Sequence, residues 1–362
     1  MTDRHSPQTP QPPPARKGRG ALSNPDNRYS ARQVRPFDDG WWRDEPLESL
    51  ATQVIREEVR TIVTTNSSPD IPFDKSINPY RGCEHGCIYC YARPSHAYWD
   101  MSPGLDFESK IVVKPGAAAL LRKTFSNPRY ECSSINIGAN TDPYQPLEAS
   151  FGTTREILEV LREFDHPFSI ITKSALILRD LDILSDMAAK RLCSVAISVT
   201  TLDNELKRVM EPRAASPSSR LRAISTLSAA GVPVSMLVAP VIPMINDREI
   251  EAILEAGKKA GVRAANYIFL RLPLEISGLL RDWLQVHFPD RAEHVMSLVR
   301  QSRRGADYRS EFHTRMSAEG IFAEMISKRF HGAARRLGLE GNERFELDTT
   351  RFRGGDRQLD LF

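Results

Sequence analysis

The sequence has no long apolar run and few cysteines, and its charges nearly cancel. No uninterrupted apolar stretch of the 362 residues approaches the roughly 20 residues that a membrane-spanning helix needs. The first residues are polar and rich in proline, without the apolar core of a signal peptide. The formal net charge of +3 is too small to indicate a nucleic-acid or membrane partner by itself. We therefore expect a cytoplasmic protein without a membrane partner.

The five cysteines are unevenly distributed along the chain. Cys83, Cys87 and Cys90 are crowded into one short segment, whereas Cys132 and Cys193 stand alone. An odd number with this crowding is a poor disulfide framework. In a reducing compartment, such a group of thiols is more typical of a metal site.

Both ends of the chain are expected to lie outside the folded core. Residues 1–40 form a Pro-rich basic stretch with little to bury, which predicts a disordered tail. Its Gly18-Arg19-Gly20 stretch offers an alternative role in contacting phosphates. Residues 41–74 are predicted as a helical lead-in, because Leu50, Val54, Ile55 and Val59 recur at helical spacing. Residues 341–362 are predicted as a flexible tail.

Between these ends the pattern alternates between strand and helix. The predicted strands are Ser76–Tyr80, Ser134–Ala139, Phe168–Thr172, Cys193–Thr200, Pro233–Val241 and Asn266–Leu270, with a short extra strand at Lys110–Lys114. The predicted helices are Gly116–Phe125, Thr154–Phe164, Leu176–Lys190, Ser218–Ala230 and Arg248–Gly261. Six βα units favour an α/β fold with a parallel sheet, either an open partial (β/α)6 barrel or a doubly wound sheet. Residues 75–275 form this core and 276–340 a helical C-terminal extension.

The crowded cysteines form a C-x3-C-x2-C motif in the segment NPYRGCEHGCIYCYARP, directly after the first predicted strand. Thiolates suit iron–sulfur clusters or zinc. Three local thiolates would leave one iron of a [4Fe–4S] cluster open to an external ligand. A zinc site completed by His85 or a distant residue is the alternative, although structural zinc sites usually close with a second pair of ligands.

This motif, with Tyr89 just before its last cysteine, resembles the cluster loop of the radical S-adenosylmethionine (SAM) superfamily. The segments CIYCYA and TDPYQPLE resemble the spore-photolyase-like branch of that superfamily. The resemblance implies a partial (β/α)6 barrel, a [4Fe–4S] cluster on Cys83, Cys87 and Cys90, and reductive cleavage of SAM to a 5′-deoxyadenosyl radical. An electron donor such as flavodoxin or ferredoxin is then expected.

Polar residues at the strand ends are the candidates for binding SAM, because ligands bind at the carboxyl ends of parallel strands. Thr141 and Asp142 follow the second strand and are expected to accept from the ammonium of SAM, unless Asp142 only begins a turn. Lys173 ends the third strand. The resemblance implies that Lys173 neutralises the methionyl carboxylate; a solvated lysine is the alternative.

Three further residues are candidates for the cofactor site, and two tyrosines for the radical path. Ser198 is expected to bond the ribose or a backbone group. Glu211 and Arg220 are expected to act farther out, or to form an exposed salt bridge. Tyr89 and Tyr91 lie near the radical path by resemblance, either relaying a hydrogen atom or packing against the cluster.

The sequence departs from spore photolyase at one important position. In that enzyme a cysteine two residues before the polar–acidic pair donates hydrogen to the substrate radical. The corresponding residue here is Ala139, followed by Asn140. Neither can quench a carbon radical as a thiol does, so strict spore-photoproduct repair is not expected.

The last five residues carry a separate motif. Gln358, Leu359, Asp360, Leu361 and Phe362 form the pentapeptide QLDLF. It resembles the segment with which bacterial replication and repair proteins dock on the DNA sliding clamp. An apolar chain end that packs on its own domain is the alternative.

Taken with the basic stretch Lys328–Arg336, this tail favours a radical enzyme that repairs or modifies a DNA base. The same core would serve RNA, a peptide or a small molecule, because fold does not determine the substrate. A non-catalytic iron–sulfur or zinc adaptor bound to the sliding clamp is an alternative of a different class.

Overall fold

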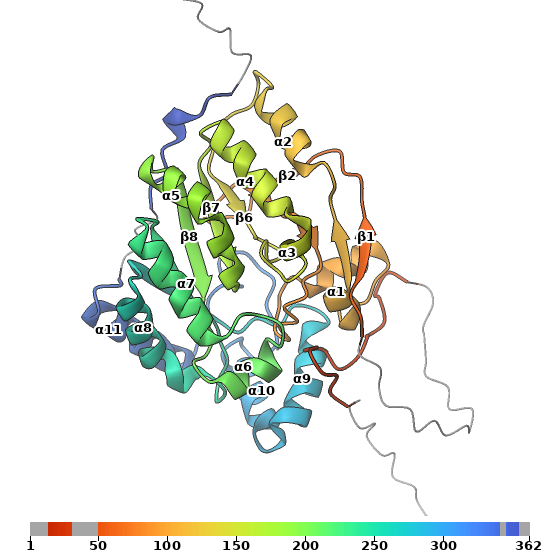
Figure 1. The fold of residues 1–362 in the computed structure, drawn as a ribbon. Coiled ribbons are helices and arrows are strands. Elements are labelled where there is room, and N and C mark those ends of the chain that lie inside the picture. The colour runs from red at the N-terminus through yellow and green to blue at the C-terminus, as the bar shows by residue number, and fades with distance from the viewer. Residues whose placement is uncertain (1–13, 31–49, 341–344, 355–362) are drawn as a thin grey trace, which may run out of the picture.

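The structure is a computed structural model that describes residues 14–30, 50–340 and 345–354 (Figure 1). Its main sheet has seven strands in the order β10-β9-β8-β7-β6-β3-β2. All neighbouring pairs are parallel except β2 with β3. The strands are β2 (Val63–Thr65), β3 (Lys75–Ile77), β6 (Ile135–Ile137), β7 (Phe168–Thr172), β8 (Cys193–Ser198), β9 (Val234–Val241) and β10 (Ala264–Phe269). The six parallel strands confirm the predicted partial (β/α)6 barrel.

Helices cover the outer face of this sheet (Figure 1). In α4, Ile157, Leu158 and Leu161 share one buried face and pack into the main core with strand residues such as Ile137. The covering helices are α2 (Ala117–Phe125), α4 (Thr153–Glu163), α5 (Leu181–Ala189), α7 (Pro217–Ala229) and α8 (Ile250–Ala260). Each lies within a few residues of its predicted position. The alternation of buried strands and amphipathic helices therefore built the barrel as expected.

The C-terminal extension is helical, as predicted. It comprises α9 (Ile276–His287), α10 (Ala292–Gln301) and α11 (Ile321–Arg336). α11 packs against α8, where Arg329 forms an ion pair with Glu251 at 2.7 Å. The short helices are η1 (Arg93–Trp99), α1 (Leu105–Ser109), α3 (Glu148–Phe151), η2 (Ala175–Asp180), α6 (Asn204–Met210), η3 (Asp247–Glu249), η4 (Pro289–Arg291) and η5 (Thr349–Arg351). No helix within the described ranges is long and apolar enough to cross a membrane.

The predicted helical lead-in is wrong for its described part. Residues 53–56 form β1 (Gln53–Arg56), which pairs in parallel with β5 (Lys110–Val113); β5 in turn pairs with β4 (Tyr80–Arg81). Val54 and Ile55 are exposed, so their helical spacing marks no buried face. The β-branched pair favours an extended backbone, and hydrogen bonds to β5 decide the structure.

The predicted tails are partly wrong as well. Residues 14–30 pack on the barrel, with Arg19, Gly20, Ala21 and Leu22 buried. Composition missed this because polar groups hold the segment, including the N–H groups of Gly20 and Ala21 and the side chain of Arg19, through hydrogen bonds to distant residues. Residues 345–354 also pack: the ring of Phe352 lies 5.5 Å from that of Phe125. The rest of both predicted tails lies outside the described residues.

Candidate active site

The three crowded cysteines lie in a loop that contacts the protein on two sides. The N–H of Cys83 donates to the carbonyl of Phe107 at 2.9 Å, and that of Ile88 to Met210 at 3.1 Å. Gly86 has φ +68°, and a Cβ there would lie 2.9 Å from the carboxylate of Glu108. A side chain at position 86 would therefore disturb the loop. Cys83 and Cys87 are buried and Cys90 is half-buried. This cluster loop (residues 82–92) holds three thiols at the end of the first barrel strands.

The thiols are close enough to influence each other's ionisation. Burial raises the pKa of Cys83 well above its usual value, and Asp142, Cys87 and Cys90 raise it further. Burial also raises the pKa of Cys87 to about 12, although Lys173 partly opposes it. Bound iron would supply the positive charge that stabilises such thiolates. Among the described residues, no three His, Cys, Asp or Glu side chains, the three thiols included, are gathered as ligands of one metal ion. The donors available in the loop are nevertheless three soft thiols, the ligand type that an iron–sulfur cluster would use.

Behind the loop, a buried ion pair joins Arg93 to Glu108. Arg93 also donates through Nε to the carbonyl of Cys87 at 2.9 Å. The remaining capacity of the Glu108 carboxylate is filled by the N–H groups of Gly20 and Ala21, at 2.9 and 2.8 Å. We call residues 16–30 the N-terminal brace. Through Gly20 and Ala21, the brace is bonded to the same Glu108 carboxylate that pairs with Arg93 behind the cluster loop.

Asp142 joins the ends of two strands to the cluster loop. Its carboxylate accepts from the Thr172 hydroxyl and the Lys173 N–H, each at 2.7 Å, and lies 3.3 Å from Nδ1 of His85. Burial works to raise its pKa, but His85 and these hydrogen bonds hold it at about 2. Because these partners occupy the carboxylate, Asp142 is equipped to position the loop and the Lys173 backbone. His85, the alternative zinc ligand, pairs with Asp142.

Tyr89, Glu211 and Arg220 form one buried network. The Tyr89 hydroxyl and the Arg220 guanidinium both bond the Glu211 carboxylate, which also accepts from Thr200 at 2.8 Å. Arg220 further donates to the carbonyl of Ser198 at 3.0 Å. Burial opposes the charge of Glu211, yet Arg220 and Lys173 hold its pKa at about 2. The alternative of an exposed salt bridge is wrong, because Glu211 and Arg220 are buried.

The remaining predicted cofactor residues differ in whether their side chains already have partners among the described residues. Thr141 is buried, and its hydroxyl donates to the Tyr80 carbonyl at 3.0 Å. Ser198 is buried at the end of β8. Lys173 has its Nζ 5.8 Å from the centre of the Tyr89 ring, and no carboxylate of a described residue pairs with it. Burial works to lower the pKa of Lys173, but Cys87 and Glu211 raise it, so the amine is charged. Lys173 is the predicted residue best able to meet an anionic group.

Tyr91 lies at the open end of the barrel. It is 51% exposed, and its hydroxyl donates to the carbonyl of Ala139. The guanidinium of Arg271, just after β10, lies 5.6 Å from the centre of its ring. Tyr91 thus joins the cluster loop to the ends of β6 and β10.

Comparison with known proteins decides the family. The family model described as Radical SAM superfamily matches residues 77–257, half of the chain. The chain belongs to the radical SAM superfamily. Members of this superfamily use a [4Fe–4S] cluster and SAM, and the chain is therefore a radical SAM enzyme.

Its relatives are uncharacterized proteins. The protein Rv2578c of Mycobacterium tuberculosis is 35% identical over 64% of this chain and 68% of its own length. The protein MJ0683 of Methanocaldococcus jannaschii is 29% identical over 60% of this chain and 78% of its own length. Spore photoproduct lyase complexed with dinucleoside spore photoproduct has a similar fold, with a TM-score of 0.55 at 15% identity, covering 78% of this chain and 79% of that one. At this identity the likeness concerns the fold alone.

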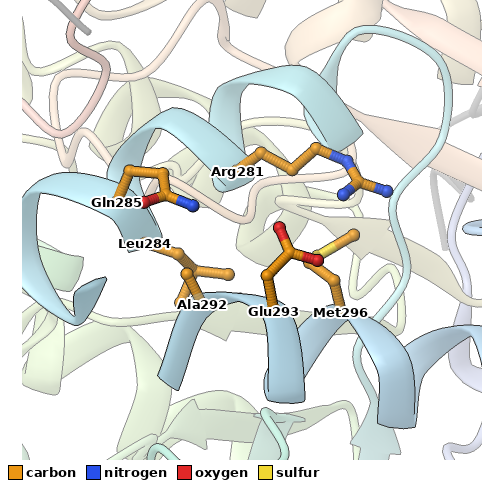
Figure 2. Close-up of a pocket in the computed structure, with 6 residues that line it drawn as sticks. All are labelled: Arg281, Leu284, Gln285, Ala292, Glu293 and Met296. Carbon is orange, nitrogen blue, oxygen red and sulfur yellow. The ribbon is translucent and has the colours of Figure 1, made fainter. Parts of the chain in front are cut away.

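Sequence reasoning missed several residues of this site. Glu108 lies far from the quoted cluster segment, and Arg93 and Gly20 were given no role at this site; only their contacts reveal them. Arg271 carried a signal that could have found it, because it follows the last barrel strand at the ligand-binding end. A pocket between α9 and α10, lined by Arg281, Leu284, Gln285, Ala292, Glu293 and Met296, contains none of the predicted site residues (Figure 2).

Proposed function

We propose that this radical SAM enzyme holds its [4Fe–4S] cluster on Cys83, Cys87 and Cys90 and acts on a nucleic acid, repairing or modifying a DNA base. When bound, the cluster supplies the electron that cleaves SAM to methionine and a 5′-deoxyadenosyl radical. The observation that carries this assignment is the arrangement of three thiols in one loop at the ends of the barrel strands. The barrel orients the cofactors and excludes water.

The chain's own residues divide the work around these cofactors. Lys173 binds the SAM carboxylate, since its ammonium is charged and free of a described counter-ion. Asp142 orients the Lys173 backbone and His85. Glu211 and Arg220 hold the Tyr89 ring beside the thiols. Tyr91, whose hydroxyl contacts the carbonyl of Ala139, serves as the hydrogen donor in place of the missing thiol.

A pair of exposed tyrosines favours nucleic acid as the substrate. Tyr29 and Tyr98 are 60% and 71% exposed, and their rings stack with centres 5.3 Å apart. The Arg28 guanidinium lies over both rings, 4.6 and 5.6 Å from their centres. Arg28 also pairs with Glu275, at the start of α9, beside the red N-terminal segment in Figure 1. Exposed aromatic rings with an arginine are a common platform for unpaired bases.

The first experiment is anaerobic reconstitution with iron and sulfide, followed by SAM, a strong reductant and an assay for 5′-deoxyadenosine. Formation that is lost in Cys87→Ala and retained in Cys132→Ala, a cysteine outside the cluster loop, supports the cluster assignment. A fully loaded chain that forms none contradicts it and favours the adaptor.

Hydrogen abstraction is then tested with unlabelled SAM and with deuterated DNA, RNA and peptide pools, because the 5′-deoxyadenosyl radical takes its hydrogen from the substrate. Deuterium that enters 5′-deoxyadenosine from DNA supports the proposed substrate. Deuterium that enters only from RNA, a peptide or a small molecule contradicts it. Loss of labelling in Tyr98→Leu but not in Tyr98→Phe would implicate ring stacking, because only the phenylalanine retains the π face.

We also propose that Gln358, Leu359, Asp360, Leu361 and Phe362 dock on the sliding clamp. These residues lie outside the described part of the chain, so the proposal depends on the motif alone. Pull-down on purified clamp is expected to recover the full chain and to lose a chain that ends at residue 357. Equal recovery of the two chains would contradict clamp binding without affecting the radical chemistry.

A further inference from the structure

A cation that forms no ion pair with a described carboxylate lies at the open end of the barrel. Arg271 follows β10, and its Nε is buried without a hydrogen-bond partner. Its Nη1 points at the sulfur of Met316, 2.7 Å away. A thioether is a weak acceptor. Among the described residues, no carboxylate forms an ion pair with Arg271, although most arginines of the chain have one. The guanidinium therefore has N–H groups that are available to donate hydrogen bonds to an oxygen ligand.

A second arginine lies behind the first. Arg303 is almost fully buried and donates to backbone carbonyls, including that of Leu270 at 3.0 Å. Its own Nε also lacks a partner. Burial lowers the pKa of Arg303 to about 10, and the charge of Arg271 lowers it further. Glu319, the acidic group that favours its charge, is itself paired with Arg304 and Arg309. Two guanidinium groups thus share one region without a described acidic partner of their own.

Such an arrangement favours an anion. A desolvated cation costs free energy unless it meets an opposite charge. The planar guanidinium fork matches the oxygens of a phosphate better than an ammonium does. The half-exposed Tyr91 ring beside Arg271 offers a face on which a base could stack. Lys173, at the end of β7 and close to Tyr89, is the cation placed for the SAM carboxylate.

We propose that Arg271 binds a phosphate group of the substrate, with Arg303 strengthening the positive potential behind it. This inference rests on the proposed function and deepens it, because it identifies a nucleotide phosphate as the group that is recognised at the barrel mouth. Met316 swings away from Nη1 when the phosphate oxygen arrives. The substrate base then lies against Tyr91, in front of the cluster loop.

The test compares three variants of the full, anaerobically reconstituted chain. A fluorescent single-stranded oligonucleotide is titrated at several salt concentrations. Arg271→Gln is expected to weaken binding about tenfold and to reduce the salt slope by about one. Arg271→Lys, which keeps the charge and loses the fork, should fall between. Arg222→Gln removes the same charge from an exposed site on α7 and should bind like the parent chain.

A second readout separates the substrate from SAM. Formation of 5′-deoxyadenosine without substrate is expected to keep the parent chain's dependence on SAM concentration in Arg271→Gln. Equal oligonucleotide affinity in Arg271→Gln and Arg222→Gln would overturn the proposal. So would a raised SAM requirement with unchanged oligonucleotide affinity, which would make Arg271 part of the cofactor site.

Failure of the proposed function has a different signature. If the parent chain binds no oligonucleotide, inorganic phosphate becomes the probe, and the thermal midpoint is measured with increasing phosphate. If phosphate stabilises the parent chain and Arg222→Gln but not Arg271→Gln, the result supports the phosphate site and contradicts a nucleic-acid substrate. Equal responses of all variants reject the site.

Discussion

Replacing Gly20 by alanine is expected to loosen the cluster loop from a distance of more than sixty positions in the chain. A Cβ at position 20 would lie 1.9 Å from the carbonyl oxygen of Gly86, the residue next to Cys87. Neither backbone can yield without moving, so the N-terminal brace must shift away from the loop. That shift breaks the hydrogen bonds from Gly20 and Ala21 to Glu108.

The size of the effect follows from these two bonds. A buried group that loses its partner costs about 1–3 kcal/mol, so two lost donors predict a loss of roughly 2–6 kcal/mol of unfolding free energy. For a chain of this size, at about 2 cal/mol/K of unfolding entropy per residue, each kcal/mol lowers the thermal midpoint by about 1–2 °C. Glu108 would remain paired with Arg93, so the barrel is expected to fold. Iron content after reconstitution should fall with the weakened loop.

The matched control is Gly278→Ala. A Cβ there meets nothing within 4 Å, and the position lies inside α9. Alanine favours a helix by up to about 1 kcal/mol, so this variant should be neutral or slightly more stable. The measurements are the thermal midpoint of the apo chain and iron bound per chain. If Gly20→Ala matched Gly278→Ala in both, the brace would have no role in holding the loop.

Three further predictions concern the charged groups of the structure. Lys173→Met should raise the SAM concentration needed for half-maximal 5′-deoxyadenosine formation by about tenfold, and an unchanged requirement would remove Lys173 from the cofactor site. Arg220→Met should lower the unfolding free energy by about 3–5 kcal/mol, because it leaves the Glu211 carboxylate buried and unpaired; denaturant unfolding within 1 kcal/mol of the parent would contradict this. Burial lowers the pKa of His166 from 6.5 to about 3, so the folded chain keeps it neutral while the unfolded chain takes up a proton below pH 6.5. Stability is therefore lost as the pH falls from about 6.5 towards 3, and His166→Phe should reduce the difference in unfolding free energy between pH 7 and pH 5 by about 2 kcal/mol; an unchanged difference would show that His166 does not contribute.

Local sequence signals were sufficient for the barrel and the thiols. Periodicity predicted the strand at 168–172 and a helix at 116–125, observed at 117–125, because one buried face repeats every two or every 3.6 residues. The three cysteines were found from their spacing alone, since one short loop carries all of them. These features depend on residues that are close together in the sequence, so the local sequence is sufficient to predict them.

Local signals failed where backbone pairing or a distant partner decides the structure. Val54 and Ile55 belong to a set of apolar residues with helical spacing, yet they pair with β5 and form a strand. The segment around Gly20 has the composition of a disordered tail, yet the Glu108 carboxylate, 88 positions away, orders it. Composition measures the apolar surface that a segment can bury, and it is blind to hydrogen bonds with a distant carboxylate.

The sequence by itself thus determined the fold class, the thiol loop and the strand ends at which polar residues gather. Only the tertiary structure decided which of these polar residues are free. Asp142 and Glu211 are occupied by partners from other elements, whereas Lys173 and Arg271 lack a described counter-ion. The reason is physical: whether a buried charge is paired, or free to bind a ligand, depends on partners that are distant in the sequence and close in the fold. The positions of these groups in the sequence do not show which of them are in contact in the folded protein.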